Sequence, residues 1–437
     1  MIEDTIAAIA TAAGVAGVGI VRLSGPQAIA IAADALGVSA AQLDRRVRLG
    51  WVRDRAGRRL DQVLAFAMRG PASFTGEDVA ELHGHGGPRN LEQLLAAVVE
   101  RGARVASPGE FTRRAVAHGK LDLIRAEALL DVIHAGSERA WRLAQANLGG
   151  KLGDEVAALE RRTLAVLAEL EGSIDFPEDD LALATADTFD GELAAVHAGC
   201  GRVAAGFRHG RAVTRGLTAA LIGAVNVGKS SLLNALVGRE RALVAAAPGT
   251  TRDWLEVGDT WSGVSVTLID TAGLRATDDP VERRGISLGE ARVEAADVVI
   301  VVNDGAAPWD DGARYADRRI VVRSKADLGG ELLGALATSA STGQGLDDLR
   351  RRVLEVAGVA DREGSEPPFV TTARQQALAV AARDALGAAR AALGAARPPE
   401  VVAVELRDAA RALAELRGVE VGERVLDEVF ARFCIGK

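Results

Sequence analysis

A glycine-rich segment at residues 223–230, GAVNVGKS, constrains the fold of this 437-residue chain more than any other feature. It matches the pattern G-x-x-x-x-G-K-S, follows the apolar run 218–223 and precedes a helical pattern at 231–237. In that setting the glycines let backbone N–H groups approach phosphate at a helix N-terminus, and the lysine reaches the β- and γ-phosphates. The segment therefore predicts a phosphate-binding loop inside an α/β domain.

Further apolar runs indicate the sheet of that domain. Besides 218–223, candidate strands lie at 264–270, 298–303 and 320–324. The last two are continuous apolar runs, which are typical of parallel strands buried on both faces. The alternation of these strands with loops and helices predicts a nucleotide-binding domain with a mainly parallel sheet, which we place at residues 216–360.

The rest of the chain falls into two kinds of pattern. Residues 1–118 alternate short β-like runs with Ala-rich helical runs, which predicts a small α+β domain. Apolar residues at helical spacing fill 119–215 and 361–437, with Leu164 on the first stripe. These two segments flank the nucleotide domain, and neither needs to fold alone. We therefore predict a multidomain α/β protein in which the nucleotide domain is inserted into a helical domain.

Composition and charge exclude several classes of protein. Apolar residues make up 48% and charged residues 26%, as in folded globular proteins rather than disordered ones. A net charge of −8 argues against binding nucleic acid through bulk charge. Two cysteines, Cys200 and Cys434, are too few for a disulfide framework, and the Ala- and Gly-rich run 6–21 is a poor signal peptide or membrane span. We expect a cytoplasmic protein without membrane segments.

Two later motifs at strand ends indicate which nucleotide is bound. DTAG at 270–273 offers an aspartate for a metal ion and a glycine N–H that senses the γ-phosphate. SKAD at 324–327 supplies Asp327, whose carboxylate accepts from the N1–H and amino group of guanine, which adenine cannot satisfy. With TSA at 338–340 as a further base-facing loop, the motif order favours GTP and a Ras-like phosphate-loop GTPase domain. The predicted GTP contacts are Asn226, Val227, Gly228, Lys229, Ser230, Ser231, Ala245, Ala246, Ala247, Pro248, Gly249, Thr250, Thr251, Asp270, Thr271, Ala272, Gly273, Ser324, Lys325, Asp327, Ser339, Ala340 and Ser341.

Hydrolysis in this chain needs groups other than those of Ras-like enzymes, because Leu274 follows DTAG in place of their water-orienting glutamine. Glu282 is our candidate for orienting the attacking water. Asn226 can help hold a monovalent cation that supplies positive charge. Each of these two residues has a plain alternative as a solvated surface group. The hydroxyls of Ser230 and Thr251 are the predicted Mg²⁺ ligands.

Motifs outside the nucleotide domain give the chain a specific resemblance to one family. They read IVRLSG at 20–25, SFTGEDV at 73–79, HGHGG at 83–87, PGEFT at 108–112, GKLD at 119–122, IDFP at 174–177 and FCIGK at 433–437. Together with the GTPase motifs they resemble, over the full length, the tRNA-modification GTPase family MnmE, also called TrmE. Other phosphate-loop GTPases would share the nucleotide domain alone.

This resemblance implies a homodimer joined through N-terminal domains that bind a reduced folate, 5,10-methylene- or 5-formyl-tetrahydrofolate. It also implies an FAD-dependent partner protein that forms a heterotetramer-type complex with the chain and acts with it on tRNA. The two proteins would build an aminomethyl or carboxymethylaminomethyl substituent on carbon 5 of the wobble uridine, using a folate-borne one-carbon unit. GTP hydrolysis in this family is activated by potassium and by dimerisation of the G domains.

The resemblance also implies roles for particular residues. The folate contacts it implies are Arg22, Glu81, Lys120 and Lys437. The potassium ligands it implies are Asn226 and, through backbone carbonyls of the 245–250 loop, Ala245, Ala247 and Thr250. The magnesium ligands it implies are Ser230 and Thr251, and the carboxylate that orients the attacking water is that of Glu282. Cys434 is either a nucleophile toward uridine carbon 6, a ligand for the one-carbon intermediate, or a thiol that only lines the folate pocket.

Three positions depart from the family pattern. Ser324 replaces an asparagine whose amide bridges the base loop to the phosphate loop, so we expect weaker guanine affinity, with the selectivity kept by Asp327. Val225 replaces a proline, and Ala245 replaces a commoner threonine.

Two other functions stay open at this point. One is a ribosome-assembly GTPase that acts as an RNA-binding switch, and the other is a nucleotide-gated structural dimer without catalysis. Basic clusters at 45–48 and 208–215 are candidate solvated faces and do not decide between them.

Overall fold

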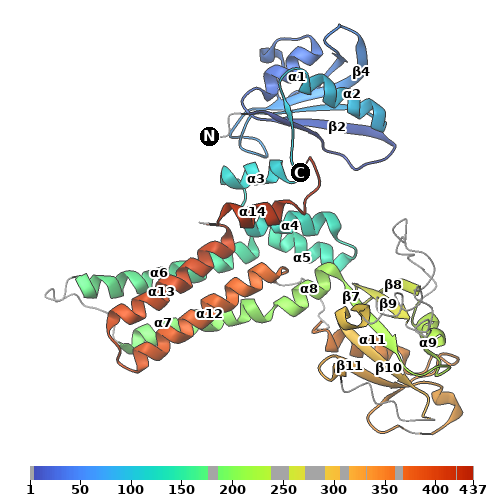
Figure 1. Ribbon diagram of the computed structural model, residues 1–437. Helices are drawn as coiled ribbons and strands as arrows, with labels where there is room; N and C mark the ends of the chain where they lie inside the picture. The colour runs from blue at the N-terminus through green and yellow to red at the C-terminus, as the bar shows by residue number, and fades with distance from the viewer. Residues whose placement is uncertain are drawn as a thin grey trace. The chain divides into compact units, whose positions relative to one another are not determined.

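The computed structural model of the chain describes residues 4–175, 186–237, 255–270, 291–305, 314–330, 332–359, 368–419 and 421–436. The chain divides into two compact units, Met1–Leu130 with Arg417–Lys437, and Asp131–Leu416. Figure 1 labels their helices and strands.

The first unit is built on a six-stranded sheet with the order β3-β4-β5-β2-β1-β6. All neighbouring strands are antiparallel except β1 and β6, which are parallel. The β-like runs predicted from the sequence, 18–23, 64–68 and 79–82, are parts of β2, β4 and β5. The bounds are β1 Ile6–Ile9, β2 Ala16–Ser24, β3 Arg48–Arg53, β4 Arg59–Met68, β5 Val79–Gly86 and β6 Arg104–Val105.

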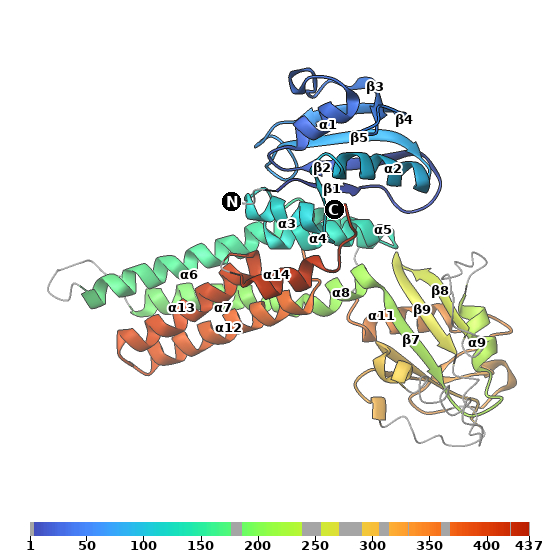
Figure 2. The same cartoon turned by 45° about the horizontal axis from the view of Figure 1, so that its top comes forward.

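Two helices, α1 (Ala28–Leu36) and α2 (Pro88–Val99), cover one face of this sheet (Figure 2). Side chains of a strand alternate between faces, so Val63, Ala65 and Ala67 of β4 are buried under the helices. Leu64 and Phe66, between them, point to the opposite face, where Leu64 is 47% exposed. This alternation leaves the second face of the sheet for the candidate site described below.

The end of the chain packs within the same unit. Phe430 at the end of α14 (Glu423–Phe430) and Phe433 form an apolar cluster with Leu123 and Ala126 of α4 (Leu123–His134). Gly109, which precedes α3 (Glu110–Ala117), has φ 67°, and a Cβ there would lie 2.7 Å from the Phe430 carbonyl oxygen. The segment after α14 is thus fixed beside α3. Only residues 417–437 of our predicted segment 361–437 belong to this compact unit. The limits of that segment stay a prediction.

The helices of the second unit come from both sides of the nucleotide domain. Helix α12 packs along α7, and α7 packs against α6 (Figure 1). Ion pairs of Arg390 with Asp190 (2.8 Å) and of Arg407 with Glu171 (2.7 Å) join the two halves, which confirms the predicted insertion. The bounds are α5 Glu138–Leu148, α6 Lys151–Asp175, α7 Ala186–Ala205, α8 Phe207–Arg215, α12 Ala373–Gly394 and α13 Pro399–Arg417.

Two residues of the apolar stripe predicted by helical spacing, Ile133 and Leu164, were placed wrongly, and Ile133 is 42% exposed. Leu164 of α6 is 43% exposed, while Thr163 is fully buried and donates from its Oγ1 to the Leu159 carbonyl at 3.0 Å. The buried face of the helix runs from Leu159 through Thr163 to Val166 and Leu167, so the helical turn carries Leu164 outward. A threonine can occupy the buried position because its hydroxyl bonds to the preceding turn.

The nucleotide domain contains a second six-stranded sheet with the order β12-β11-β10-β7-β9-β8. All pairs are parallel except β8 with β9, which confirms the predicted mainly parallel sheet. The four predicted strands are present within a residue, whereas β8 and β12 were not predicted. The bounds are β7 Leu217–Ile222, β8 Leu255–Trp261, β9 Val264–Asp270, β10 Val298–Asn303, β11 Arg319–Arg323 and β12 Leu336–Ala337, with helices α9 Lys229–Leu236 and α11 Leu346–Val356.

Among the described residues, no helix combines the length and the apolar character needed to cross a membrane.

Candidate functional site

The phosphate loop joins the end of β7 to the start of α9. Gly223 has φ 153°, and a Cβ at that position would collide with the Val302 carbonyl oxygen, so only glycine fits. Gly228 and Asn226 also have positive φ, at 95° and 66°. The Lys229 Nζ atom donates to the carbonyls of Gly223 (3.0 Å) and Ala224 (2.8 Å), so the loop closes around the ammonium group.

Two oxygen groups meet beside this loop. The Ser230 Oγ atom donates to Asp270 Oδ2 at 2.6 Å, which brings the first residues of α9 to the end of β9. Hydroxyl and carboxylate oxygens are the ligands that Mg²⁺ prefers, so this pair fits the predicted metal. Lys229 is 7% exposed, and burial lowers the pKa of its ammonium group, although the charge of Asp270 opposes this. In the described parts of the chain, no cluster of three or more His, Cys, Asp or Glu side chains could hold a metal ion.

The predicted base loops also come together. Asp327 Oδ1 accepts from Ser339 Oγ at 2.6 Å, and Ser339 contacts Ser341 at 2.9 Å. The hydrogen bond from Ser339 lowers the pKa of Asp327, which keeps the carboxylate charged as an acceptor. A cavity of about 530 Å³ lies between these loops and the phosphate loop. It is lined by Gly228, Ser231, Leu232, Asn234, Ala235, Ser324, Lys325, Asp327, Thr338, Ala340 and Ser341.

Ser324 reaches the phosphate loop despite its short side chain. Its Oγ atom is 2.5 Å from the Val227 carbonyl oxygen and 3.3 Å from that of Asn303, and the residue is 4% exposed. The neighbouring Lys325 donates to the Asn226 carbonyl at 3.0 Å. Serine therefore forms here the bridge that we expected an asparagine to make, and the weaker guanine affinity stays a prediction.

Several predicted site residues lie outside the described residues. They are Ala245, Ala246, Ala247, Pro248, Gly249, Thr250, Thr251, Thr271, Ala272, Gly273, Glu282 and Lys437.

A second constellation lies on the open face of the N-terminal sheet. Arg22 of β2 and Glu81 of β5 are directly opposite each other, and Arg22 Nε is 2.8 Å from Glu81 Oε1. His83, two residues further along β5, places Nε2 at 2.7 Å from Glu81 Oε2. We did not predict a role for His83. The sequence did contain a signal for this role, because residues two apart in a β-strand share a face of the sheet, and His83 follows Glu81 by two.

The end of the chain meets this constellation. The Gly436 carbonyl oxygen is 3.5 Å from Arg22 Nη1, and the Gly109 N–H donates to the Cys434 carbonyl at 3.4 Å. Cys434 is exposed. The rings of Phe74 and Phe111 each lie 5.9 Å from the guanidinium carbon of Arg22. Lys120 contacts the loop before β5 instead, donating from Nζ to the Pro71 carbonyl at 3.0 Å.

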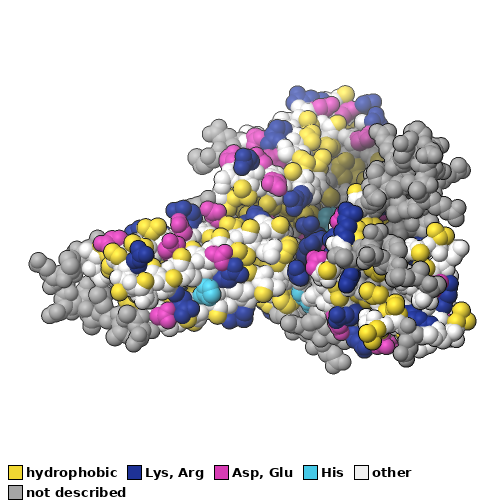
Figure 3. Space-filling model, turned by 60° about the horizontal axis from the view of Figure 1, so that its bottom comes forward, with side chains coloured by type: hydrophobic (Ala, Val, Ile, Leu, Met, Phe, Trp, Pro, Cys, Tyr) yellow, Lys and Arg dark blue, Asp and Glu magenta, His cyan; other side chains and the backbone are white. Residues whose placement is uncertain are grey.

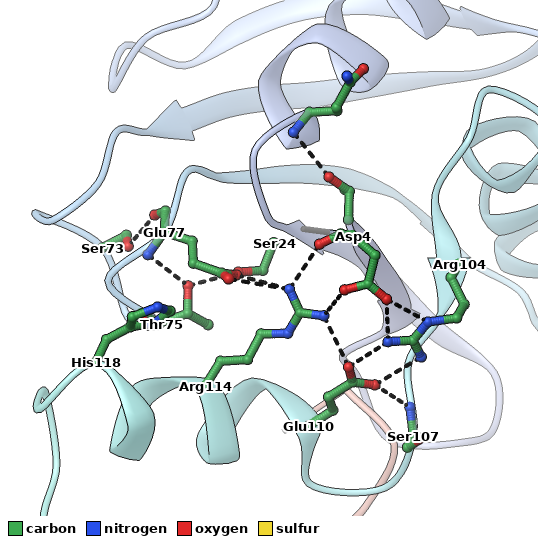
Figure 4. Close-up of polar contacts among 12 residues, drawn as sticks. Asp4, Ser24, Ser73, Thr75, Glu77, Arg104, Ser107, Glu110, Arg114 and His118 are labelled. Carbon is green, nitrogen blue, oxygen red and sulfur yellow. Dashed lines mark hydrogen bonds and ion pairs between the residues drawn. The ribbon is translucent and has the colours of Figure 1, made fainter. Parts of the chain in front are cut away.

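A buried polar network holds the loop that carries Phe74 (Figure 4). Arg114 is 1% exposed and donates to Asp4 (2.7 Å), Glu77 (3.2 Å) and Glu110 (3.0 Å). Ser24 contacts Thr75 and donates to Glu77, each at 2.7 Å. A buried guanidinium is tolerated only when it is paired, so three carboxylates fix Arg114 and, through it, the loop. The FTGED motif is thus a structural support for the constellation around Arg22.

Comparison with known families identifies the chain's relatives. The family model described as GTP-binding protein TrmE N-terminus matches residues 5–120, and the model of the MnmE helical domain matches residues 123–434. The chain belongs to the MnmE family.

Relatives in this family align along the whole chain. The tRNA modification GTPase MnmE of Parasynechococcus marenigrum (strain WH8102) is 45% identical, covering 100% of this chain and 99% of the relative. The proteins of the same name from Symbiobacterium thermophilum and Moorella thermoacetica are 42% and 40% identical, over 100% of both chains in each case. The match to MnmE proteins is therefore not confined to the nucleotide domain, as it would be for a ribosome-assembly GTPase.

Proposed function

We propose that this MnmE-family chain is a potassium-activated GTPase that works with an FAD-dependent partner on tRNA. The pair installs an aminomethyl or carboxymethylaminomethyl substituent on carbon 5 of the wobble uridine, with the one-carbon unit supplied by a reduced folate. Membership in a family of tRNA modification GTPases makes the chain a GTP hydrolase. Potassium, folate, the partner and the uridine chemistry belong to the proposal, as does a cytoplasmic location.

The phosphate loop supports the GTPase part of the proposal. Lys229 would hold the β- and γ-phosphates, and the Ser230 hydroxyl with Asp270 behind it would hold Mg²⁺, which neutralises charge on those oxygens. The Asn226 side chain and backbone carbonyls at 245–250 would hold potassium. Positive charge at that place does the work of an arginine finger, worth about 10³-fold or more in related enzymes. Glu282 would orient the attacking water.

The tRNA-modification part of the proposal is supported by one observation, which is that Gly436 lies beside Arg22. Gly436 lies 414 residues from Arg22 in the sequence, and its carbonyl oxygen is 3.5 Å from the Arg22 guanidinium. Arg22, Lys120 and Lys437 would attract the anionic tail of a folate, while the Glu81 carboxylate accepts from the donor edge of its pterin. Cys434 would then lie near the one-carbon unit, as nucleophile, ligand or pocket wall.

The open sheet face supports the proposed homodimer. Leu49 is 63% exposed, Trp51 36% and Leu64 47%, and all three lie on the face of the N-terminal sheet opposite α1 and α2. Apolar side chains that share one face are typical of a surface covered by another protein. A second copy of this chain is the proposed occupant.

The proposal is tested by GTP hydrolysis in KCl and in NaCl at equal ionic strength. We expect hydrolysis in KCl to be faster by about 10-fold or more, and equal rates would overturn the potassium mechanism. Purified protein should also release a reduced folate on denaturation, visible by its ultraviolet absorbance. Absence of folate together with cosedimentation with ribosomes would favour the ribosome-assembly function instead.

A further inference from the structure

His83 is not among the expected folate contacts, but its side chain touches Glu81, which is one of them. His83 follows Glu81 by two residues on β5, and both project from the sheet face opposite α1 and α2. His83 Nε2 is 2.7 Å from Glu81 Oε2, and Arg22 Nε is 2.8 Å from Glu81 Oε1. Each oxygen of the Glu81 carboxylate therefore has its own partner.

The His83 ring is itself fixed. It packs against Phe66 with ring centroids 5.3 Å apart and planes at 60°. In the sheet it lies between Leu64 of β4 and Ile20 of β2. The His83 side chain is 25% exposed and that of Glu81 10%, so the contact is largely shielded from water. A carboxylate only accepts hydrogen bonds, and Nε2 must therefore carry the proton.

We propose that His83 is a positioning residue that fixes the plane of the Glu81 carboxylate toward the pterin ring of a folate. This inference rests on the proposed folate function. A carboxylate has about four lone-pair sites, and Arg22 and His83 use two of them in defined directions. The last torsion of a glutamate side chain is broad, so a carboxylate held at one oxygen only would rotate. His83 acts through Glu81 and does not itself bind the folate.

The test measures the dissociation constant of 5-formyl-tetrahydrofolate for the full-length protein by titration calorimetry. His83→Ala should weaken binding about tenfold, because the carboxylate loses one of its two fixed partners. His83→Leu keeps apolar bulk against Phe66 but has no donor, and should weaken binding equally. His83→Gln carries an amide N–H that can replace Nε2–H, and should restore binding to within about twofold of the wild type. His134→Ala, a histidine substitution in the other compact unit, is the control.

A second arm separates positioning from direct contact. In a Glu81→Gln background the carboxylate is already gone, so adding His83→Ala should weaken binding by less than about twofold. Full additivity of the two substitutions would mean that His83 touches the folate itself, and would overturn the inference. Unchanged binding in both His83→Ala and His83→Leu, or no rescue by His83→Gln, would also overturn it. Failure of the wild-type protein to bind folate would overturn the proposed function itself, whatever the variants do.

Discussion

The phosphate site and the Arg22–Glu81 site are assembled in different ways. The phosphate site uses short sequence motifs, each at the carboxyl end of a strand in one mainly parallel sheet, where the ends of parallel strands meet at a common edge. The Ser230–Asp270 contact, for example, joins the segments that follow β7 and end β9, which are neighbours in the sheet. The Arg22–Glu81 site combines facing residues of two antiparallel strands with a chain end 414 residues away.

This difference has a consequence for how substitutions act. At the phosphate site each motif contributes its own group, so a single change should remove one function and leave the other site intact. At the N-terminal site the same side chains hold the sheet, the chain end and each other, so effects there should be coupled. Figure 3 shows that, on the visible face of the helical arm, Lys and Arg side chains are interspersed with Asp and Glu.

The largest effect is expected for Lys229→Ala. Removing the Lys229 ammonium group, around which the loop closes, should lower the rate of GTP hydrolysis by about 100- to 1,000-fold. The reason is that a positive charge held against the phosphates is lost. Folate binding measured on the same protein should stay within about twofold of the wild type. A parallel loss of folate affinity would show that the two sites are not independent.

The next effect concerns Cys434, which is exposed near the chain end. If the thiol is the nucleophile, Cys434→Ser should lower the rate of wobble-uridine modification by at least about 100-fold while GTP hydrolysis is unchanged. Nucleoside analysis of tRNA by mass spectrometry, alongside phosphate release, measures both. Normal modification by this variant would leave Cys434 as a residue that lines the pocket.

A smaller effect is expected at Ser324. Replacing it with alanine leaves the buried Val227 carbonyl without its donor and should weaken GTP and GDP binding about tenfold. Selectivity against ATP should be kept, because Asp327 is unchanged. Fluorescent nucleotide titrations of Ser324→Ala and of Ser324→Asn, which retains a donor, provide the measurement. Affinity equal to the wild type in the alanine variant would show that the bridge between the loops contributes nothing.

A different kind of effect, on stability, is expected for Asp61 of β4, on the face of the N-terminal sheet that α1 and α2 cover. Burial opposes the charge of Asp61, but hydrogen bonds from Asn90 and from the backbone and ring of His85 outweigh it, so the pKa of Asp61 is lowered. A lowered pKa in the folded state stabilises the protein above the unfolded value of about 4, and this contribution is lost as pH falls. Asp61→Asn should therefore lower the free energy of unfolding by about 1–3 kcal/mol at pH 7, because an amide N–H would face these hydrogen-bond donors.

Hydrogen exchange of peptides from β5 and α2 measures this cost at pH 7. Urea unfolding between pH 7 and pH 3 should then show a weaker dependence on pH in the variant than in the wild type. An unchanged pH dependence would contradict the role assigned to Asp61. Phosphate release serves as the control, because the GTPase site should be unaffected.

Much of the fold was predictable from local sequence. The apolar runs VVIVV and IVV located strands β10 and β11, and the glycine and lysine pattern located the turn from β7 to α9. Strand β8 was missed, although a hairpin signal was present. Ser262 and Gly263 have φ values of 46° and 75°, as a tight two-residue turn between antiparallel strands requires. The partly polar run LEVGDTW at an edge of the sheet lacks the apolar continuity that revealed the buried strands.

Sequence alone determined the nucleotide class, the order of domains and the family, because these depend on residue types at fixed short spacings. It did not determine that a serine completes the bridge from the base loop to the phosphate loop, since the distance from Ser324 to Val227 depends on how two loops pack. Nor did it determine that His83 joins Arg22 on the Glu81 carboxylate, or that the segment 434–436 lies beside Arg22. Those contacts depend on strand register and on packing between distant segments, which no local pattern encodes.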